Sequence, residues 1–461
     1  MKTFQSYHSI ISIFIAVLLF SSCDDFVEVD LPPTQLTSTT VFEDRATADA
    51  AIAEIYYGLR ANGMLAGTSS GLSVEMGAYS DELAYYGDDS METSNFYTNG
   101  LLATSGEILA WWNTAYNQIY QCNAVLQGVA ASDGLEQSDK DKLRGEALFI
   151  RGLLHLYLVN IFGDIPYITT TDYNLNSTVS RMSTATVYEH IIADLTQASV
   201  LLPGDYTSPD RAKPNKFSAH ALLARAYLSA GFWTEAANEA SVVLNQSGTY
   251  TMGSVPGTFL KDSPSTIWQL ATPADGQNTD EAVSFIFTDA PPYFVALSEE
   301  LVTAFEPGDQ RKEHWVGSVS DGTNNYYFAY KYKQVDNTGS SLEYPIMLRL
   351  SEQYLIRAEA RAKQGDLTGA KEDLDSIRLF AGLGNTTAGT QEAIIAAIVR
   401  ERRVEFFTEH GHRFFDLKRN NSLDASLSPT KPGWNASDGL LPIPDTEITL
   451  NPQLAPQNPG Y

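Results

Sequence analysis

Two stretches of the chain decide the fold. Residues 219–244 read AHALLARAYLSAGFWTEAANEASVVL, and residues 353–378 read QYLIRAEARAKQGDLTGAKEDLDSIR. Superposing Gly231 on Gly365 also aligns Leu222 with Ile356, Ala224 with Ala358, Ala226 with Ala360, and Ala236 with Ala370. Small residues at these spacings let two antiparallel helices pack closely around a tight turn at the glycine. The sequence therefore predicts one helical hairpin in each stretch.

The remaining helical signals predict the scaffold around these hairpins. Each hairpin resembles the tetratricopeptide helix–turn–helix, but two copies are too few for a stable stack, because at least three units are needed. Apolar residues recur at helical spacing over 44–59, 143–161 and 187–202. We therefore expect a mainly α protein in which these helices complete the scaffold.

Two regions lack this helical periodicity. Residues 246–345 contain short apolar runs at 267–270 and 283–287, an alternating run at 326–333, and many Gly, Asn, Asp and Pro residues. This pattern predicts strands and long loops inserted between the two hairpins. Residues 61–107 form a second loop-rich region. Loops held on a rigid scaffold commonly carry binding sites.

The composition limits the classes of ligand. The chain has 461 residues, with 30 Lys and Arg against 56 Asp and Glu, so its net charge is −26. Such a chain repels phosphate, which argues against nucleic acid as a partner. Charged residues make up only 19%, whereas the 24 Tyr and 6 Trp together equal the Lys and Arg in number. A surface rich in amphipathic aromatic residues suits uncharged polar ligands.

The N-terminus predicts export and lipid attachment. Residues 10–20 are almost purely apolar, too short to span a bilayer but typical of a signal peptide. Phe20-Ser21-Ser22-Cys23 follows and resembles a bacterial lipobox, which implies cleavage before Cys23 and acylation of its thiol and amino terminus. The alternative is an ordinary secretory signal with an incidental cysteine. Acylation leaves only Cys122, which lies on an apolar helical stripe and is expected in the core.

Six segments together resemble the SusD/RagB family of nutrient-binding outer-membrane lipoproteins. They are residues 23–25, 39–60, 151–168, 344–366, 400–419 and 440–461. The resemblance implies a mainly α, SusD-like fold with four tetratricopeptide-like helix pairs and an irregular region that carries the ligand site. It also implies a SusC-like TonB-dependent transporter as partner, an oligosaccharide ligand, surface exposure on the outer membrane through a lipid anchor, and no cofactor.

The chain is accordingly divided into five segments. They are a signal peptide (1–22), a lipidated N-terminus and tether (23–40), an N-terminal helical region (41–245), a loop and short-strand insertion (246–345), and a C-terminal helical region with an extended tail (346–461).

Aromatic residues in the two loop regions are the binding candidates. A pyranose has a face of C–H groups and a rim of hydroxyls, so its site needs an aromatic ring with polar groups beside it. The first region offers Tyr79, Tyr85, Tyr86, Phe96 and Tyr97, flanked by Asp81, Asp88, Asn95 and Asn99, and the second offers Tyr293, Trp315, Tyr326 and Tyr327, beside Asn324 and Asn325. The family's own glycan contacts lie in variable loops, and no motif transfers them to individual residues of this chain.

Other chemistries have weaker signals. Asp81, Glu82, Asp88, Asp89 and Glu92 cluster and could mimic a glycosidase pair, but clustering alone shows neither the spacing nor the raised pKa such a pair needs. Residues 67–71 match G-x-S-x-G without the strand that a nucleophile elbow requires, and the seven histidines lack zinc spacing. We therefore expect a non-enzymatic glycan-binding protein without a metal. A surface glycosidase and a protein-only tetratricopeptide adaptor remain the alternatives.

Two C-terminal segments are expected to be structural. Basic residues concentrate in 400–419 but alternate with acidic ones, which predicts a solvated or salt-bridged helical face rather than a phosphate site. The proline-rich residues 440–461 are expected to form an extended tail laid over the helices, with a docking surface as the alternative.

Overall fold

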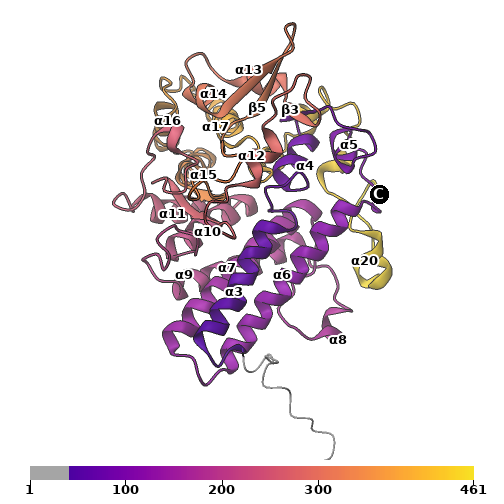
Figure 1. Ribbon diagram of the computed structural model, residues 1–461, viewed down its shortest axis with the longest axis vertical. Coiled ribbons are helices and arrows are strands. Elements are labelled where there is room, and N and C mark those ends of the chain that lie inside the picture. Colours follow the sequence, from indigo (N-terminus) through magenta and orange to yellow (C-terminus); the bar gives the residue numbers. More distant parts are fainter. Residues whose placement is uncertain (1–40) are drawn as a thin grey trace, which may run out of the picture.

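The computed structural model describes residues 41–461 (Figure 1). The predicted signal peptide, Cys23 and the tether lie outside the described residues. Within the described part, the protein is mainly helical, as the sequence predicts, and it carries two small antiparallel sheets.

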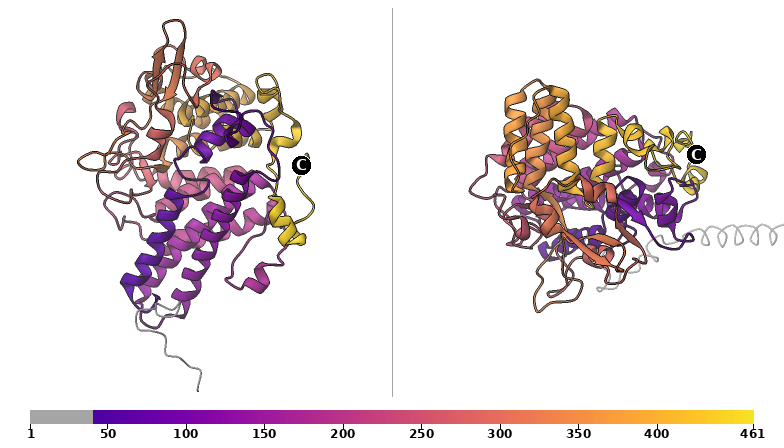
Figure 2. Two further views of the ribbon diagram at one scale, coloured as in Figure 1. Left: turned by 45° about the vertical axis from the view of Figure 1, so that its right-hand side comes forward. Right: turned by 90° about the horizontal axis from the view of Figure 1, so that it is seen from above.

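Long helices form a continuous stack. They are α3 (Arg45–Ala61), α6 (Gly106–Ala131), α7 (Gln137–Phe162), α9 (Thr184–Leu201), α10 (Lys216–Ala230), α11 (Trp233–Leu244), α15 (Leu350–Lys363), α16 (Leu367–Phe380) and α17 (Gln391–Phe406). From α6 to α16 each helix packs against the next, α3 packs on α6 and α7, and α17 packs on α15 and α16 (Figures 1 and 2). Adjacent helices thereby bury the apolar stripes that none could bury alone.

The two repeated hairpins are neighbours in this stack. They form α10–α11 and α15–α16, and α11 packs directly on α15 although the whole insertion separates them in sequence. Gly231 and Gly365 end the first helix of each pair with φ of 82° and 87°, a conformation that glycine adopts without strain. Ala224, Ala240 and Ala360 are fully buried in one core between the hairpins. The hairpin prediction is confirmed.

Helix α7 is the central core helix. By length and composition it could cross a bilayer, but 94% of its most apolar window is buried inside the protein. Cys122 of the neighbouring α6 is a free, fully buried thiol, and burial raises its pKa to about 12. The expectation that Cys122 is a core residue is confirmed.

The two loop regions meet in one sheet. Its strand order is β1 (Leu83–Tyr85), β3 (Val295–Leu297), β5 (Asn325–Ala329) and β4 (Val316–Ser320), all antiparallel. A second pair joins β2 (Thr266–Gln269) to β6 (Ile346–Arg349). Short helices surround these strands: α4 (Leu72–Tyr79), α5 (Glu92–Tyr97), α12 (Asp280–Phe285), α13 (Glu299–Ala304) and α14 (Gln310–Trp315).

One strand expected in the insertion is wrong. The apolar run at 283–287 overlaps α12 instead of forming a strand. Asp280 and Glu281 occupy the first turn of that helix, where acidic side chains favour the helix dipole.

The C-terminal segments depart from the simple expectations. Arg402 of α17 and Arg419 of α18 (His412–Arg419) are salt-bridged as predicted, to Asp416 and Glu359, each at 2.7 Å. Their side chains are buried rather than solvated, whereas Arg400 is exposed. The tail over residues 440–461 is not wholly extended, because it contains α20 (Asp445–Leu450) and η4 (Pro452–Leu454); α19 (Leu423–Leu427) and η3 (Ala436–Gly439) precede it. Fully buried Leu441 and Ile443 anchor it to the core.

Candidate functional site

The four-stranded sheet brings together aromatic candidates from both loop regions. Tyr86 directly follows β1, and its N–H donates to the carbonyl of Phe294 at 2.7 Å. Its ring meets the ring of Tyr326 on β5, with centroids 5.7 Å apart and planes at 82°. This edge-to-face geometry is a favourable arrangement for aromatic pairs. Residues more than two hundred positions apart in the sequence thus form one surface.

Side chains along β5 alternate between two faces of the sheet. Tyr327 faces the main core, where Tyr85 of β1 also packs. Tyr85 contacts the rings of Tyr97 and Phe294 at 6.0 and 6.1 Å, and burial raises its pKa. The rings of Tyr85 and Tyr327 are both partly exposed. They lie on the core side of the sheet, beneath its other face.

The opposite face carries a row of rings that we call the aromatic platform: Tyr86, Tyr326, Phe328 and Tyr330, bordered by Phe287. Phe328 lies 5.1 Å from Phe287 and 5.7 Å from Tyr330 between centroids. Its ring covers Gly317 so closely that a Cβ there would lie 2.3 Å from it. Phe287, Phe328 and Tyr330 are not among the candidates predicted from the sequence. Alternation within residues 326–333 was the signal that could have placed Phe328 and Tyr330 beside Tyr326.

The platform is open to solvent at Tyr86 and partly at Tyr326 and Tyr330, whereas Phe328 and Phe287 are buried, and it has a polar edge. Tyr86 is 43% exposed, and Tyr293, next to Phe294, is 73% exposed. At the β4–β5 turn, Asp321 accepts backbone N–H groups from Thr323 and Asn324 at 2.8 and 2.7 Å, which lower the pKa of its carboxyl. Its other oxygen accepts the Tyr326 hydroxyl at 3.2 Å. Asn324 and Asn325 are exposed beside it. Ring faces and hydrogen-bonding groups are therefore adjacent.

Three of the aromatic candidates, Tyr79, Phe96 and Trp315, have side chains that are almost completely buried. Tyr79 at the end of α4 packs on Phe96, and its hydroxyl donates to the carbonyl of Asp438 at 3.0 Å. Trp315, which ends α14, donates its indole N–H to the carbonyl of Val255 at 2.9 Å. All three rings fill the core beneath the loops. Tyr97 is half-buried below Tyr85, while Asn95 is exposed on α5.

The acidic cluster does not form an open catalytic pair. Asp81 is buried, and its carboxylate accepts hydrogen bonds from Arg413 at 2.7 and 2.8 Å and lies 2.9 Å from the guanidinium of Arg403. Burial raises the pKa of Glu82 to about 8, but the side chain is enclosed. Glu92 instead accepts from Ser105 Oγ and the N–H of Gly106 at the start of α6. Among residues 41–461, no group of three or more His, Cys, Asp or Glu is placed to hold a metal.

A stack of paired helices that supports an inserted aromatic surface defines a class of helical-repeat binding proteins. Comparisons with known proteins identify the class more closely. A family model described as "Starch-binding associating with outer membrane" matches residues 26–228, and the SusD family model matches residues 302–461. The chain belongs to the SusD/RagB family of carbohydrate-binding, outer-membrane-associated proteins.

Individual relatives agree with this assignment. A SusD-like protein of Formosa agariphila is 29% identical over 77% of this chain and 81% of the relative, and a second one is 23% identical over 96% and 98%. The crystal structure of a SusD superfamily protein from Bacteroides vulgatus has a TM-score of 0.80 at 21% identity, covering 92% of this chain and all of that one. A laminarin-binding SusD-like protein has a TM-score of 0.74 at 23% identity, covering 90% and 99%.

Proposed function

We propose that this protein is a non-catalytic, cell-surface glycan receptor that captures neutral oligosaccharides on the aromatic platform and delivers them to a TonB-dependent outer-membrane transporter. The observation that carries the proposal is the convergence of Tyr86 and Tyr326 on one exposed sheet face, with Tyr293 beside it. Family membership supports carbohydrate as the class of ligand.

The platform suits a sugar for physical reasons. A pyranose ring can place its C–H face on the ring of Tyr86 or Tyr326. This contact removes apolar surface of both the sugar and the tyrosine from water. Its hydroxyls then lie near Asp321, Asn324 and Asn325, which can replace the hydrogen bonds lost to water. An open platform also accommodates an internal segment of a longer chain. The net charge of −26 favours neutral glycans over polyanionic ones.

The remaining parts of the proposal concern placement. Acylation at Cys23 would hold the protein on the outer membrane, and residues 24–40 would act as the tether. A SusC-like transporter is the partner that the family resemblance implies. Binding must be reversible for transfer to follow capture, so we expect modest affinity.

Calorimetric titration of the purified protein with a glycan panel tests the proposal. The panel should include laminarin and starch oligosaccharides, because a structurally similar protein binds laminarin and a matching family model is described as starch-binding. We expect saturable heat with at least one glycan and no new reducing ends after prolonged incubation. Absence of heat with every glycan contradicts the proposal. Sustained release of reducing ends indicates the glycosidase, and a co-purified β-barrel without any glycan response indicates the adaptor.

A further inference from the structure

A cavity lies away from the platform. It has a volume of about 540 Å³ and lies between α6, the 166–179 segment that contains α8 (Tyr173–Asn176), and the C-terminal α20 and η4. Figures 1 and 2 show α20 well below the β-hairpin that carries Tyr326. The volume falls within the roughly 300–1,000 Å³ of small-molecule sites. None of its lining residues belongs to the platform.

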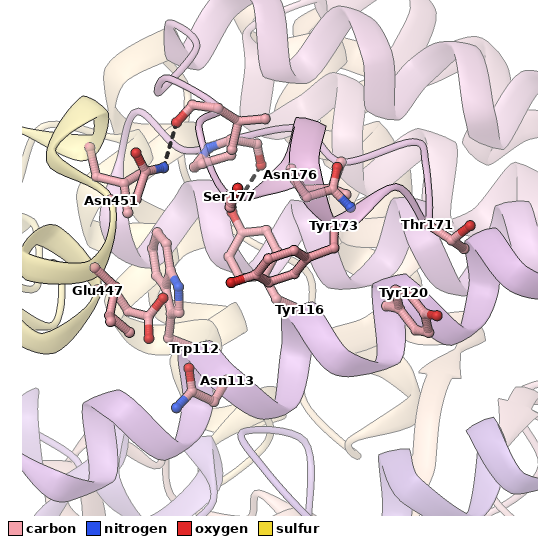
Figure 3. Close-up of a pocket in the computed structure, with 15 residues that line it drawn as sticks. Trp112, Asn113, Tyr116, Tyr120, Thr171, Tyr173, Asn176, Ser177, Glu447 and Asn451 are labelled. Atoms are coloured by element: carbon pink, nitrogen blue, oxygen red, sulfur yellow. Dashed lines mark hydrogen bonds between the residues drawn. The ribbon is translucent and has the colours of Figure 1, made fainter. Parts of the chain in front are cut away.

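Aromatic rings from two elements line this cavity. Trp112, Tyr116 and Tyr120 are spaced four residues apart, so they share one face of α6. The stripe runs from the buried Trp112, whose ring centroid lies 4.8 Å from that of Tyr116, to Tyr120, which is 48% exposed. Tyr173 of α8 is 79% exposed. Trp112 is almost completely buried in the core, yet it also forms a wall of this cavity (Figure 3).

The walls of the cavity are held in place by hydrogen bonds between elements. Tyr116 donates its hydroxyl to the carbonyl of Pro166 at 2.9 Å, which fixes the ring. Asn451, just after α20, donates to the carbonyl of Val179 at 2.8 Å, and Asn176 donates to the carbonyl of Thr170 at 2.8 Å. The C-terminal segment is thereby tied to the segment around α8. Because the cavity is preformed, fewer side chains and loops have to be ordered when a ligand binds, and the free-energy cost of binding is smaller.

Polar groups of the cavity are available to a ligand. Within residues 41–461, the side-chain amide of Asn113 and the hydroxyls of Tyr120 and Tyr173 make no hydrogen bond to another residue. The Glu447 carboxyl lies beside Trp112 at the cavity wall (Figure 3), and partial burial raises its pKa. A carboxylate can accept hydrogen bonds from two neighbouring hydroxyls of one sugar ring.

The charges lining the cavity select among ligands. Among the described residues that line it, there is one carboxylate, Glu447, and neither lysine nor arginine. A sulfated or uronic-acid sugar would therefore have no counter-ion there. Four aromatic side chains, three side-chain amides and a single acceptor carboxylate instead match the C–H faces and hydroxyls of a neutral sugar.

We propose that the cavity between α6, α8 and α20 is a second glycan site, which binds a short neutral oligosaccharide segment between Tyr120, Tyr173 and Glu447. This inference rests on the proposed function and deepens it. Two separate sites on one receptor would hold two segments of a long glycan, so that release from one site leaves the other occupied.

Titration with short sugars tests this second site. The probes are laminaritetraose, maltotetraose, cellotetraose and mannotetraose, added to the purified protein in a calorimeter. For a probe that binds, we expect two sites per chain. Tyr120→Ala combined with Tyr173→Ala should remove one site, and Tyr86→Ala combined with Tyr326→Ala should remove the other. Glu447→Gln should weaken the cavity site about tenfold while keeping its shape.

Matched controls keep the outcomes distinct. Tyr57→Ala, which removes another exposed tyrosine that does not line the cavity, should leave both sites intact. Circular dichroism should show that the cavity variant folds, because Tyr120 and Tyr173 are exposed. The same measurement checks the folding of the other variants. If the cavity variant binds with unchanged stoichiometry and affinity while the platform variant loses all binding, the second site is refuted and the proposed function stands. If no probe binds the wild type, both the second site and the proposed function are contradicted. Glucosamine, which is positively charged, serves as a further probe. If it binds the cavity and none of the four neutral tetrasaccharides does, a neutral-sugar site is contradicted.

Discussion

Replacing Arg311 by Met should destabilise the protein by about 3 kcal/mol. The Arg311 side chain is completely buried at the start of α14, which runs directly into strand β4 of the platform sheet. Its guanidinium binds Asp309 at 2.8 and 2.9 Å, Glu401 at 2.6 Å and Glu405 at 2.9 Å. The substitution leaves buried carboxylates without this cation.

The magnitude follows from what remains after the substitution. Breaking a buried ion pair by removing one partner costs about 3–5 kcal/mol. Arg378 still reaches Glu401 at 3.2 Å, and Arg349 still binds Glu405, so we expect the lower end of that range. Against a total stability of about 5–15 kcal/mol, this is a large loss.

The assay is urea unfolding followed by both far-ultraviolet circular dichroism and tryptophan fluorescence, since coincident transitions justify a two-state analysis. Arg361→Met is the matched control, because Arg361 also binds aspartates but its side chain is 29% exposed. That control should lose at most about 1 kcal/mol. A loss below about 1 kcal/mol in Arg311→Met, or an equal loss in both variants, would refute the reasoning.

The pH dependence gives an independent check of the same network. Burial alone would raise the pKa of Glu405, but Arg349 and Arg311 hold it at about 2. A lowered folded-state pKa contributes stability above the unfolded pKa, and this contribution is lost as the pH falls toward 2. Without Arg311 the pKa of Glu405 rises. The difference in stability between wild type and Arg311→Met should therefore shrink between pH 7 and pH 3.

Three further predictions concern the turn, a buried carboxyl and the anchor. Gly365→Ala should cost about 1–2 kcal/mol in urea unfolding because φ is +87°, whereas Gly384→Ala, which also has open space but no positive φ, should cost far less. Burial raises the folded-state pKa of Glu82 to about 8, so wild-type stability should fall as the pH rises from 4.5 to 8; Glu82→Gln should flatten this slope, and an unchanged slope would contradict the burial argument. Cys23→Ala should move the protein from the membrane fraction to the soluble fraction after cell breakage, and continued membrane retention would count against acylation at Cys23.

The helical hairpins could be predicted from sequence because their determinants are local. A glycine at the turn and alanines at fixed spacings specify each hairpin, and Gly231 and Gly365 both adopt positive φ. That α11 packs directly on α15 could not be predicted, since nothing in residues 246–345 states that the chain returns to the same edge of the stack.

The candidate site was only partly predictable for a related reason. Strands β1 and β3 have three residues each, too few to show a period, so their pairing is visible only in the fold. Tyr79 and Phe96 lie in short helices without a long apolar stripe, and exposed and buried rings look alike there. The burial of Asp81 was not predictable either, because its partner Arg413 is distant in sequence.

The most direct test of the central claim is the affinity of the platform variant for a neutral oligosaccharide that binds both the wild type and the cavity variant Tyr120→Ala with Tyr173→Ala. The double variant Tyr86→Ala with Tyr326→Ala should bind that glycan at least tenfold more weakly, because it removes the two rings that offer the sugar a flat apolar face. Tyr57→Ala should change the dissociation constant less than twofold. Unchanged affinity in a correctly folded double variant would contradict the account.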